Sequence, residues 1–210
     1  MTRKEPGSIG SRELGADCEN EPRLGDLDTN AVAVVGTLAA SPYGEHVADD
    51  LGRDLARRGI TVINGAGYGI EGEALRGAVS ASGPGRCVIV LPCGIDVEHP
   101  ARHGPLRQDI IESGGFLVSE YPLGMRPRRA RVHARQRLVA ALSGSTVVVE
   151  AGRRSPALAV ARAACTLGRR VYAVPGPVTA ETSAGTNELL RTRVATVITC
   201  ARDLTTRSLQ

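Results

Sequence analysis

Aromatic side chains are scarce in this chain of 210 residues, which contains four tyrosines, one phenylalanine and no tryptophan. Long apolar runs are absent as well, because none approaches the roughly eighteen residues that a membrane-spanning helix needs. The first residues, 1–5, are followed by polar sequence rather than by the apolar stretch of a secretion signal. The sequence therefore predicts neither a membrane protein nor a secreted one.

Paired cysteines and metal-binding spacings are also lacking. The five cysteines are an odd number without a C-x-x-C pair, which favours a reducing cytoplasm over a disulfide framework or a zinc site. The four histidines, His103 among them, show no metal-ligand spacing and are interpreted as solvated or lightly packed. We expect a cytoplasmic protein without a metal or another cofactor.

Common catalytic motifs are missing too, since G-x-S-x-G, H-E-x-x-H and the Walker lysine loop do not occur. No serine or cysteine has an evident base nearby. Four carboxylates at predicted strand ends could each act as a general base or pair with an arginine: Asp96, Glu98, Glu120 and Glu150. We therefore expect a non-enzymatic protein, with a nucleotide hydrolase as the alternative.

Charge is distributed unevenly along the chain. The net charge is only +4, yet residues 121–180 hold eleven arginines and one acid, whereas residues 1–120 hold 11 basic and 18 acidic groups. This basic block indicates a polyanionic ligand, although a solvated arginine-rich face would have the same composition. All but one of the basic residues are arginines, which suit bidentate phosphate contacts.

Short apolar runs alternate with amphipathic segments from residue 31 to residue 204, a pattern typical of strands followed by helices. The predicted strands cover residues 31–35, 60–63, 87–91, 116–119, 146–149, 171–174 and 196–199. The predicted helices cover residues 44–58, 72–81, 106–113, 132–142, 157–167 and 188–193. This alternation predicts a single α/β domain with a doubly wound, mostly parallel sheet of about seven strands. Residues 1–30 are expected to form a disordered N-terminal tail and residues 205–210 a C-terminal tail.

Ligands of such sheets bind beyond the carboxyl ends of the strands, so the segments that follow the strands are the candidate site. Residues 64–71, which follow the second strand, have glycines at alternate positions and are called the glycine loop below. Glycines let backbone N–H groups approach a phosphate, but they also allow a tight turn, and both interpretations stay open. The G-x-G-x-G spacing, and the lack of a glycine fingerprint in residues 36–44, disfavour a dinucleotide site.

Six arginines lie within residues 126–137, where a loop with a proline leads into a predicted helix. Arg135 and Arg137 are two positions apart and therefore point in different directions on a helix. One could face a ligand while the other pairs with a carboxylate such as Glu150. Two aromatic side chains in the loops after the first two strands could stack on a base or pack against the protein: Tyr43 and Tyr68.

Eight motifs follow one another along the chain and together resemble one family. They are Ser41-Pro-Tyr-Gly44, Asn64-Gly-Ala-Gly-Tyr-Gly-Ile70, Leu91-Pro-Cys-Gly-Ile-Asp96, Ser119-Glu-Tyr-Pro122, Arg135-Gln-Arg-Leu-Val-Ala-Ala-Leu-Ser143, Val147-Val-Val-Glu-Ala151, Ala173-Val-Pro-Gly-Pro177 and Ser183-Ala-Gly-Thr-Asn187. By these motifs the chain, from about Val32 to Leu204, resembles the bacterial DNA-processing protein A family, also called DprA or Smf.

The resemblance implies a Rossmann-like domain that binds and protects single-stranded DNA, forms a homodimer and assists the loading of a RecA-type recombinase in natural transformation (competence) or DNA recombination. It implies no cofactor and no catalytic residue. The DNA site that it implies comprises Gly36, Thr37, Gly65, Gly67, Gly69, Arg135, Gln136 and Arg137. We add four residues of the same loops to the candidate site: Ser41, Asn64, Tyr68 and Ser155. A supporting basic patch would consist of Arg126, Arg128, Arg129 and Arg131.

The chain departs from the family pattern at four positions. Leu38 stands where the family has an arginine that contacts DNA phosphate, Val132 where it has an aromatic residue, and Gln136 where it has an asparagine. Pro156 stands where the family has the glycine of an S-G pair after the fifth strand. One alternative is therefore a nucleotide-binding sensor, or a LOG-like phosphoribohydrolase, of the same fold superfamily. The P-G-G-x-G-T-x-x-E signature of those hydrolases is absent. A dimeric scaffold that binds a protein partner is the third possibility.

Overall fold

The computed structural model describes residues 31–204, so the tails predicted at residues 1–30 and 205–210 lie outside the described residues. The strands in this range are β1 (Ala31–Val35), β2 (Thr61–Asn64), β3 (Cys87–Leu91), β4 (Phe116–Ser119), β5 (Ser145–Val148), β6 (Arg170–Ala173) and β7 (Thr196–Val197). The α-helices are α2 (Pro42–Arg57), α3 (Ile70–Ser80), α4 (Gly104–Glu112), α5 (Arg129–Ala134), α6 (Gln136–Ala141), α7 (Ala157–Thr166) and α8 (Ala184–Arg191). Three short 3₁₀ helices are η3 (Ala101–His103), η4 (Glu181–Ser183) and η5 (Ala201–Asp203).

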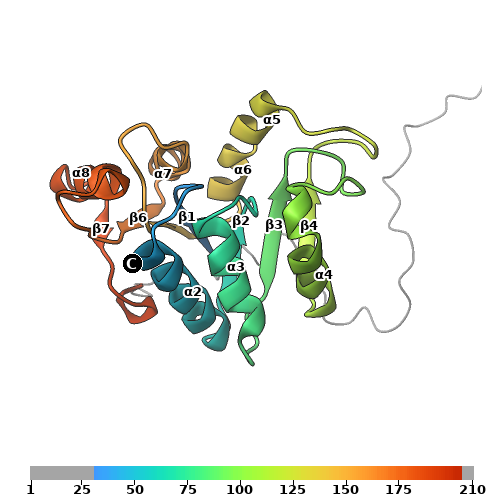
Figure 1. The fold of residues 1–210 in the computed structure, drawn as a ribbon, viewed down its shortest axis with the longest axis horizontal. Helices are drawn as coiled ribbons and strands as arrows, with labels where there is room; N and C mark the ends of the chain where they lie inside the picture. The colour runs from blue at the N-terminus through green and yellow to red at the C-terminus, as the bar shows by residue number, and fades with distance from the viewer. Residues whose placement is uncertain (1–30, 205–210) are drawn as a thin grey trace, which may run out of the picture.

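All the strands are parallel and form one open sheet in the order β4-β3-β2-β1-β5-β6-β7 (Figure 1). Helices α2, α3 and α4 pack on one face of this sheet, and α6 and α7 pack on the other. The predicted α/β, Rossmann-like, doubly wound sheet of seven strands is therefore confirmed. None of the helices within residues 31–204 has the length and apolarity to cross a membrane.

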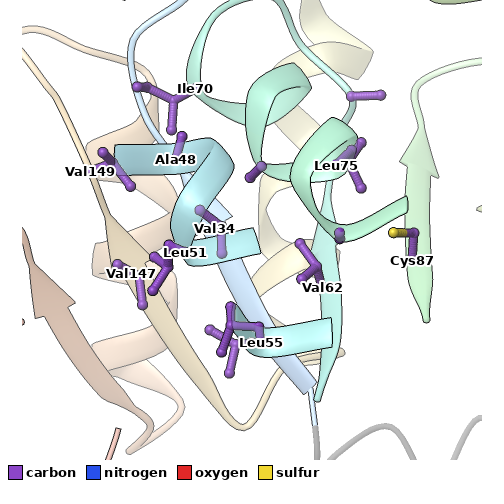
Figure 2. Close-up of a cluster of buried hydrophobic side chains, with 14 of the residues drawn as sticks. Val34, Ala48, Leu51, Leu55, Val62, Ile70, Leu75, Cys87, Val147 and Val149 are labelled. Atoms are coloured by element: carbon purple, nitrogen blue, oxygen red, sulfur yellow. The ribbon is translucent and has the colours of Figure 1, made fainter. Parts of the chain in front are cut away.

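The central strand β1 explains why its sequence is a continuous apolar run. Val32 and Val34 lie in one hydrophobic cluster, the other three residues of the strand lie in a second, and all five are buried. A parallel strand that is covered on both faces must be apolar at every position. Figure 2 shows Val34 packed among Leu51 and Leu55 of α2 in the first cluster.

Helices α2 and α3 approach each other backbone to backbone at two glycines. A Cβ atom placed on Gly52 of α2 would lie 2.0 Å from the carbonyl oxygen of Ala74, and one placed on Gly77 of α3 would lie 2.0 Å from that of Asp49. Real Cβ atoms do not come so close to a backbone atom. The two glycines therefore set the distance between the helices that cover the centre of the sheet.

The helix predicted over residues 132–142 is in fact two short helices. Arg128 is extended, so α5 begins at Arg129, and Arg135 separates it from α6. The apolar spacing that supported the prediction belongs to α6, whereas α5 has no buried residue and so leaves no such pattern in the sequence. The last helix also starts earlier than predicted, at Ala184 instead of residue 188.

Burial makes one of the cysteines chemically inert. Cys87 lies in β3, and burial raises the pKa of its thiol to about 12. Because the thiolate is the reactive form, we expect Cys165 and Cys200, which are exposed, to react with Ellman's reagent near neutral pH while Cys87 reacts only after unfolding. The measurement is labelling of a Cys18→Ser variant followed by peptide mass spectrometry. Rapid labelling of Cys87 in the folded protein would contradict this expectation.

Candidate functional site

The candidate site lies at the carboxyl edge of the sheet, where the direction of strand addition reverses. Strands β2 to β4 lie on one side of β1, and β5 to β7 lie on the other, so the loops after β1 and β5 diverge there. Open α/β sheets bind ligands at such a point. Three predicted segments meet there: the Thr37 N–H donates to the Glu150 carbonyl at 2.7 Å, and the Ile70 N–H donates to the Thr37 carbonyl at 3.3 Å.

The Glu150 side chain fills the crevice between β1 and β5. It is only 2% exposed. Its Oε1 accepts hydrogen bonds from Ser41 Oγ at 2.6 Å and Thr182 Oγ1 at 3.2 Å, and its Oε2 accepts one from the Ser41 N–H at 2.9 Å. Glu150 forms no salt bridge with any residue between 31 and 204. Ser41, a predicted site residue, therefore supports this carboxylate and also caps α2, where its Oγ accepts from the Gly44 N–H at 3.1 Å.

Several polar groups of the glycine loop are already hydrogen-bonded within the protein. The Asn64 side chain accepts from the Ala66 N–H at 2.8 Å and donates to the carbonyls of Val34 and Glu71 at 3.2 and 3.0 Å. The Glu71 carboxylate accepts from the Gly67 N–H at 2.7 Å. With the Ile70 N–H, three of the loop's N–H groups are thus occupied by the protein itself.

The glycines of the loop are also closely packed, most tightly at Gly65 and Gly69. A Cβ atom on Gly65 would lie 2.3 Å from Cζ of Arg135. Gly69 has a φ of +65°, and its Cβ would lie 2.5 Å from the Thr37 carbonyl oxygen. Gly67 would meet the Glu71 carboxylate at 2.9 Å. Of the two interpretations left open by the sequence, the tight, internally packed turn accounts for these contacts.

Arg135 lies beneath this loop and not on the surface. It is 6% exposed, and its Nη1 donates to the carbonyls of Gly65 at 2.7 Å and Val90 at 3.0 Å. Burial lowers the pKa of its guanidinium from the ordinary value, and the nearby Glu71 carboxylate, 4.0 Å from Nη2, opposes that shift. The suggested pairing with Glu150 is therefore wrong for Arg135.

Exposed arginines gather in the loop before α5 and in α5 itself, beyond the carboxyl end of the sheet (Figure 1). Arg126, Arg128 and Arg129 are exposed. Arg131 is half-buried, with its guanidinium 5.2 Å from the centre of the Tyr121 ring. Arg137 in α6 is exposed and donates to both carboxylate oxygens of Glu120 at 2.6 Å, so its partner is Glu120 instead of Glu150.

Apolar and aromatic surface borders the glycine loop on its open side. Tyr68 is 41% exposed, and its ring meets the edge of the His103 ring with centroids 5.0 Å apart. Leu38 is 60% exposed and lies against Gly67. Tyr43 lies further along the edge and donates its hydroxyl hydrogen to the Pro175 carbonyl at 3.0 Å. An exposed ring and an exposed leucine at the same loop offer contact surface for a planar apolar group.

The remaining predicted residues occupy the borders of the same edge. Gln136 is half-buried at the start of α6, and Ser155 Oγ accepts from the Ala157 N–H at 3.3 Å ahead of α7. Gly36 is buried, and a Cβ atom placed on it would lie 2.5 Å from the Ile70 side chain. No group of histidine, cysteine and acidic side chains within residues 31–204 is arranged to hold a metal ion.

Sequence reasoning missed the part that His103 plays, and its interpretation as a solvated or lightly packed side chain is wrong. His103 is buried, and its Nδ1 donates to the Ala66 carbonyl at 2.9 Å while Nε2 lies 3.3 Å from a guanidinium nitrogen of Arg76. Glu71 was missed as well. Its place four residues after Gly67, in the first turn of α3, is the signal that could have indicated a carboxylate turned back onto the loop.

Comparison with protein-family models matches residues 23–208 to the family described as DNA recombination-mediator protein A. The chain is 49% identical over 182 residues to a putative DNA processing protein DprA of Mycobacterium tuberculosis, which is 87% of this chain and 46% of that protein. It is 39% identical over 171 residues to the protein Smf of Escherichia coli, 81% of this chain and 45% of that one. The chain thus spans about half the length of these curated relatives.

Solved structures agree with this match. DNA processing protein A from Streptococcus pneumoniae superposes with a TM-score of 0.76 at 30% identity, covering 85% of this chain and 61% of that one. The protein of that name from Helicobacter pylori, described by its single-stranded DNA binding mode, has a TM-score of 0.76 at 29% identity, with 84% and 79% covered. A molybdenum cofactor binding protein from Rippkaea orientalis, 16% identical with a TM-score of 0.55 and 82% and 90% covered, shares the fold alone. None of these descriptions names a reaction.

Proposed function

Because the chain belongs to the DNA recombination-mediator protein A family, we propose that it binds single-stranded DNA along the carboxyl edge of its sheet. The observation that carries the proposal is the exposed group Arg126, Arg128 and Arg129, none of which pairs with a carboxylate within residues 31–204. Unpaired guanidinium groups on one edge supply the phosphate contacts that dominate nucleic-acid affinity. Tyr68 and Leu38, which are exposed at the glycine loop, would meet the bases.

The same geometry argues against a small-nucleotide site at the β1–β5 crevice. Glu150 and Ser41 occupy the space between the two strands and satisfy each other's polar atoms. A nucleotide phosphate at that point would meet a carboxylate instead of free N–H groups, and like charges in a buried place repel each other strongly. Elongated DNA that runs over the rim of the edge does not need this crevice.

We expect a double variant, Arg128→Ala/Arg129→Ala, to bind a fluorescent oligo-dT at least about tenfold more weakly at low salt, since two charge-assisted phosphate contacts are lost. The slope of the logarithm of affinity against the logarithm of salt concentration should also fall by about 0.7 for each contact. The measurement is fluorescence anisotropy over a salt series.

Arg57→Ala/Arg58→Ala is the matched control, because these two arginines are also adjacent and exposed but lie at the end of α2, beside the amino ends of the strands. It should leave both the affinity and the salt slope nearly unchanged. An equal loss in the control would mean that net charge, and not the proposed edge, governs binding. Failure of the unmodified protein to bind oligo-dT would overturn the proposal itself.

The proposal extends to the partners that the family resemblance implies: a second copy of the chain and a RecA-type recombinase, acting in the cytoplasm during DNA uptake or recombination. Light scattering tests the first partner, because a homodimer has twice the mass of the chain. Recombinase filament assembly on DNA precoated with a single-strand-binding protein tests the second. Unchanged assembly kinetics in the presence of this protein would remove the recombinase from the proposal.

A further inference from the structure

We propose that Arg135 is a positioning residue, which holds the glycine loop from beneath and does not contact DNA phosphate. The inference rests on the proposed function, because it assigns a role within the same site. It separates Arg135 from Arg128 and Arg129, which are exposed in the adjoining helix and loop. The arginine-rich segment then divides into a part that meets the ligand and a part that shapes the protein.

The first support is the set of acceptors that Arg135 already has. Its Nη1 bridges the carbonyl of Gly65, at the start of the glycine loop, and that of Val90 in β3, at 2.7 and 3.0 Å. The side chain therefore ties the loop to the strand next to β2. A guanidinium that turned outward to a phosphate would leave both buried carbonyls without a donor, which is costly.

The second support is the close contact at Gly65. Its Cβ position lies 2.3 Å from both Cζ and Nη2 of Arg135, so the guanidinium packs directly on the loop backbone. A side chain at position 65 would displace the guanidinium from this place. The guanidinium thus supports the loop from its buried side, where it is only 6% exposed.

The third support is the counter-charge. Glu71 lies 4.0 Å from Nη2 of Arg135 and also accepts the Gly67 N–H, so one carboxylate links the arginine to the middle of the loop. The loop in turn packs on the first-strand loop through Gly69 and Thr37. By this route Arg135 fixes the surface on which Leu38 and Tyr68 are presented.

Two readouts distinguish positioning from phosphate contact in Arg135→Lys and Arg135→Met. For both variants we expect affinity for oligo-dT to fall at least about fivefold; in Arg135→Met, which removes the charge, the salt slope should stay unchanged, whereas a lost phosphate contact would lower it by about 0.7. Without DNA, we expect amide hydrogen exchange at Ala66 and Gly67 to become faster by at least about tenfold, because the loop opens more often. A lower slope, or unchanged exchange, would overturn the proposal.

Glu71→Gln keeps the test decisive if the Arg135 variants do not fold. Removing an acid strengthens binding to a polyanion when charge alone matters, and it would also free Arg135 for a phosphate. Positioning requires the opposite result, weaker binding by at least about threefold with faster exchange at Gly67. Stronger binding would overturn the proposal. If the unmodified protein binds no DNA, the proposed function fails, yet the exchange measurement still decides whether Arg135 holds the loop.

Discussion

We expect Gly52→Ala to lower the free energy of unfolding by about 2 kcal/mol, which corresponds to a fall in melting temperature of roughly 4–8 °C for a domain of this size. Two effects oppose each other at this position. Alanine is the better helix former by about 1 kcal/mol, but its methyl group would overlap the Ala74 carbonyl, only 2.0 Å away. Because the blocking atom belongs to the backbone, no side chain can turn aside and α2 must move off α3. Overpacking therefore wins.

Gly77→Ala should cost a similar amount, since its Cβ would overlap the Asp49 carbonyl of the facing helix. The double variant should cost less than the sum of the two, because a separation of α2 from α3 caused by one methyl group also makes room for the other. Urea unfolding followed by circular dichroism measures all three. Arg162→Ala, on an exposed position of α7, is the control and should change stability by less than about 0.5 kcal/mol. If Gly52→Ala stabilises the protein, the helices do not approach as described.

The second large effect is expected at Glu150, the buried carboxylate between β1 and β5. Glu150→Ala leaves three donors without an acceptor, namely the Ser41 N–H, Ser41 Oγ and Thr182 Oγ1, and it opens a cavity under the start of α2. We expect a loss of about 3 kcal/mol, because hydrogen bonds to a charged group are worth about 1.5–3 kcal/mol each and the hydroxyls can partly find other acceptors. The N-terminus of α2, which favours negative charge, adds to the loss.

Glu150→Gln separates the contribution of charge from that of shape. The amide fits the same space with its oxygen at the Ser41 N–H and its NH₂ group at the two hydroxyls, which can also accept. Charge-assisted hydrogen bonds are replaced by weaker neutral ones, so we expect an intermediate loss of about 1–2 kcal/mol. Thermal unfolding by calorimetry measures both variants, with Glu112→Ala on the exposed side of α4 as the control. A Glu150→Ala protein as stable as the unmodified chain would show that this carboxylate costs as much in desolvation as it contributes in hydrogen bonds.

The sequence predicts the sheet well because burial on both faces leaves a local signature. Strands β1, β3 and β4 have the predicted bounds, and β2, β5 and β6 are shifted by one residue. The break between α5 and α6 left no such signature. It falls at Arg135, whose acceptors Gly65 and Val90 are 70 and 45 positions away in the sequence, so only the folded chain reveals them.

The candidate site was predictable in place but not in the direction of its side chains. The predicted segments do meet at the carboxyl edge, because parallel strands end together there. Composition alone cannot distinguish a buried arginine from an exposed one, so Arg135 and Arg128 looked alike. The same holds for His103, whose buried bond to the Ala66 carbonyl depends on a loop 37 positions earlier.

The strand order has a consequence for how the protein forms during its synthesis. Strands β1 to β4 are neighbours in chain order and can assemble from the first part of the domain alone. Strand β5, whose Ser145 pairs with Val32 of β1, is synthesised only later. At ribosomal rates of about 5–20 residues per second, the edge of β1 that faces β5 stays unpaired for roughly 6–20 s. An unpaired apolar strand edge invites pairing with other nascent chains. The nascent chain in which β1 to β4 are present but β5 is not yet synthesised is thus the form of this protein most in need of a chaperone.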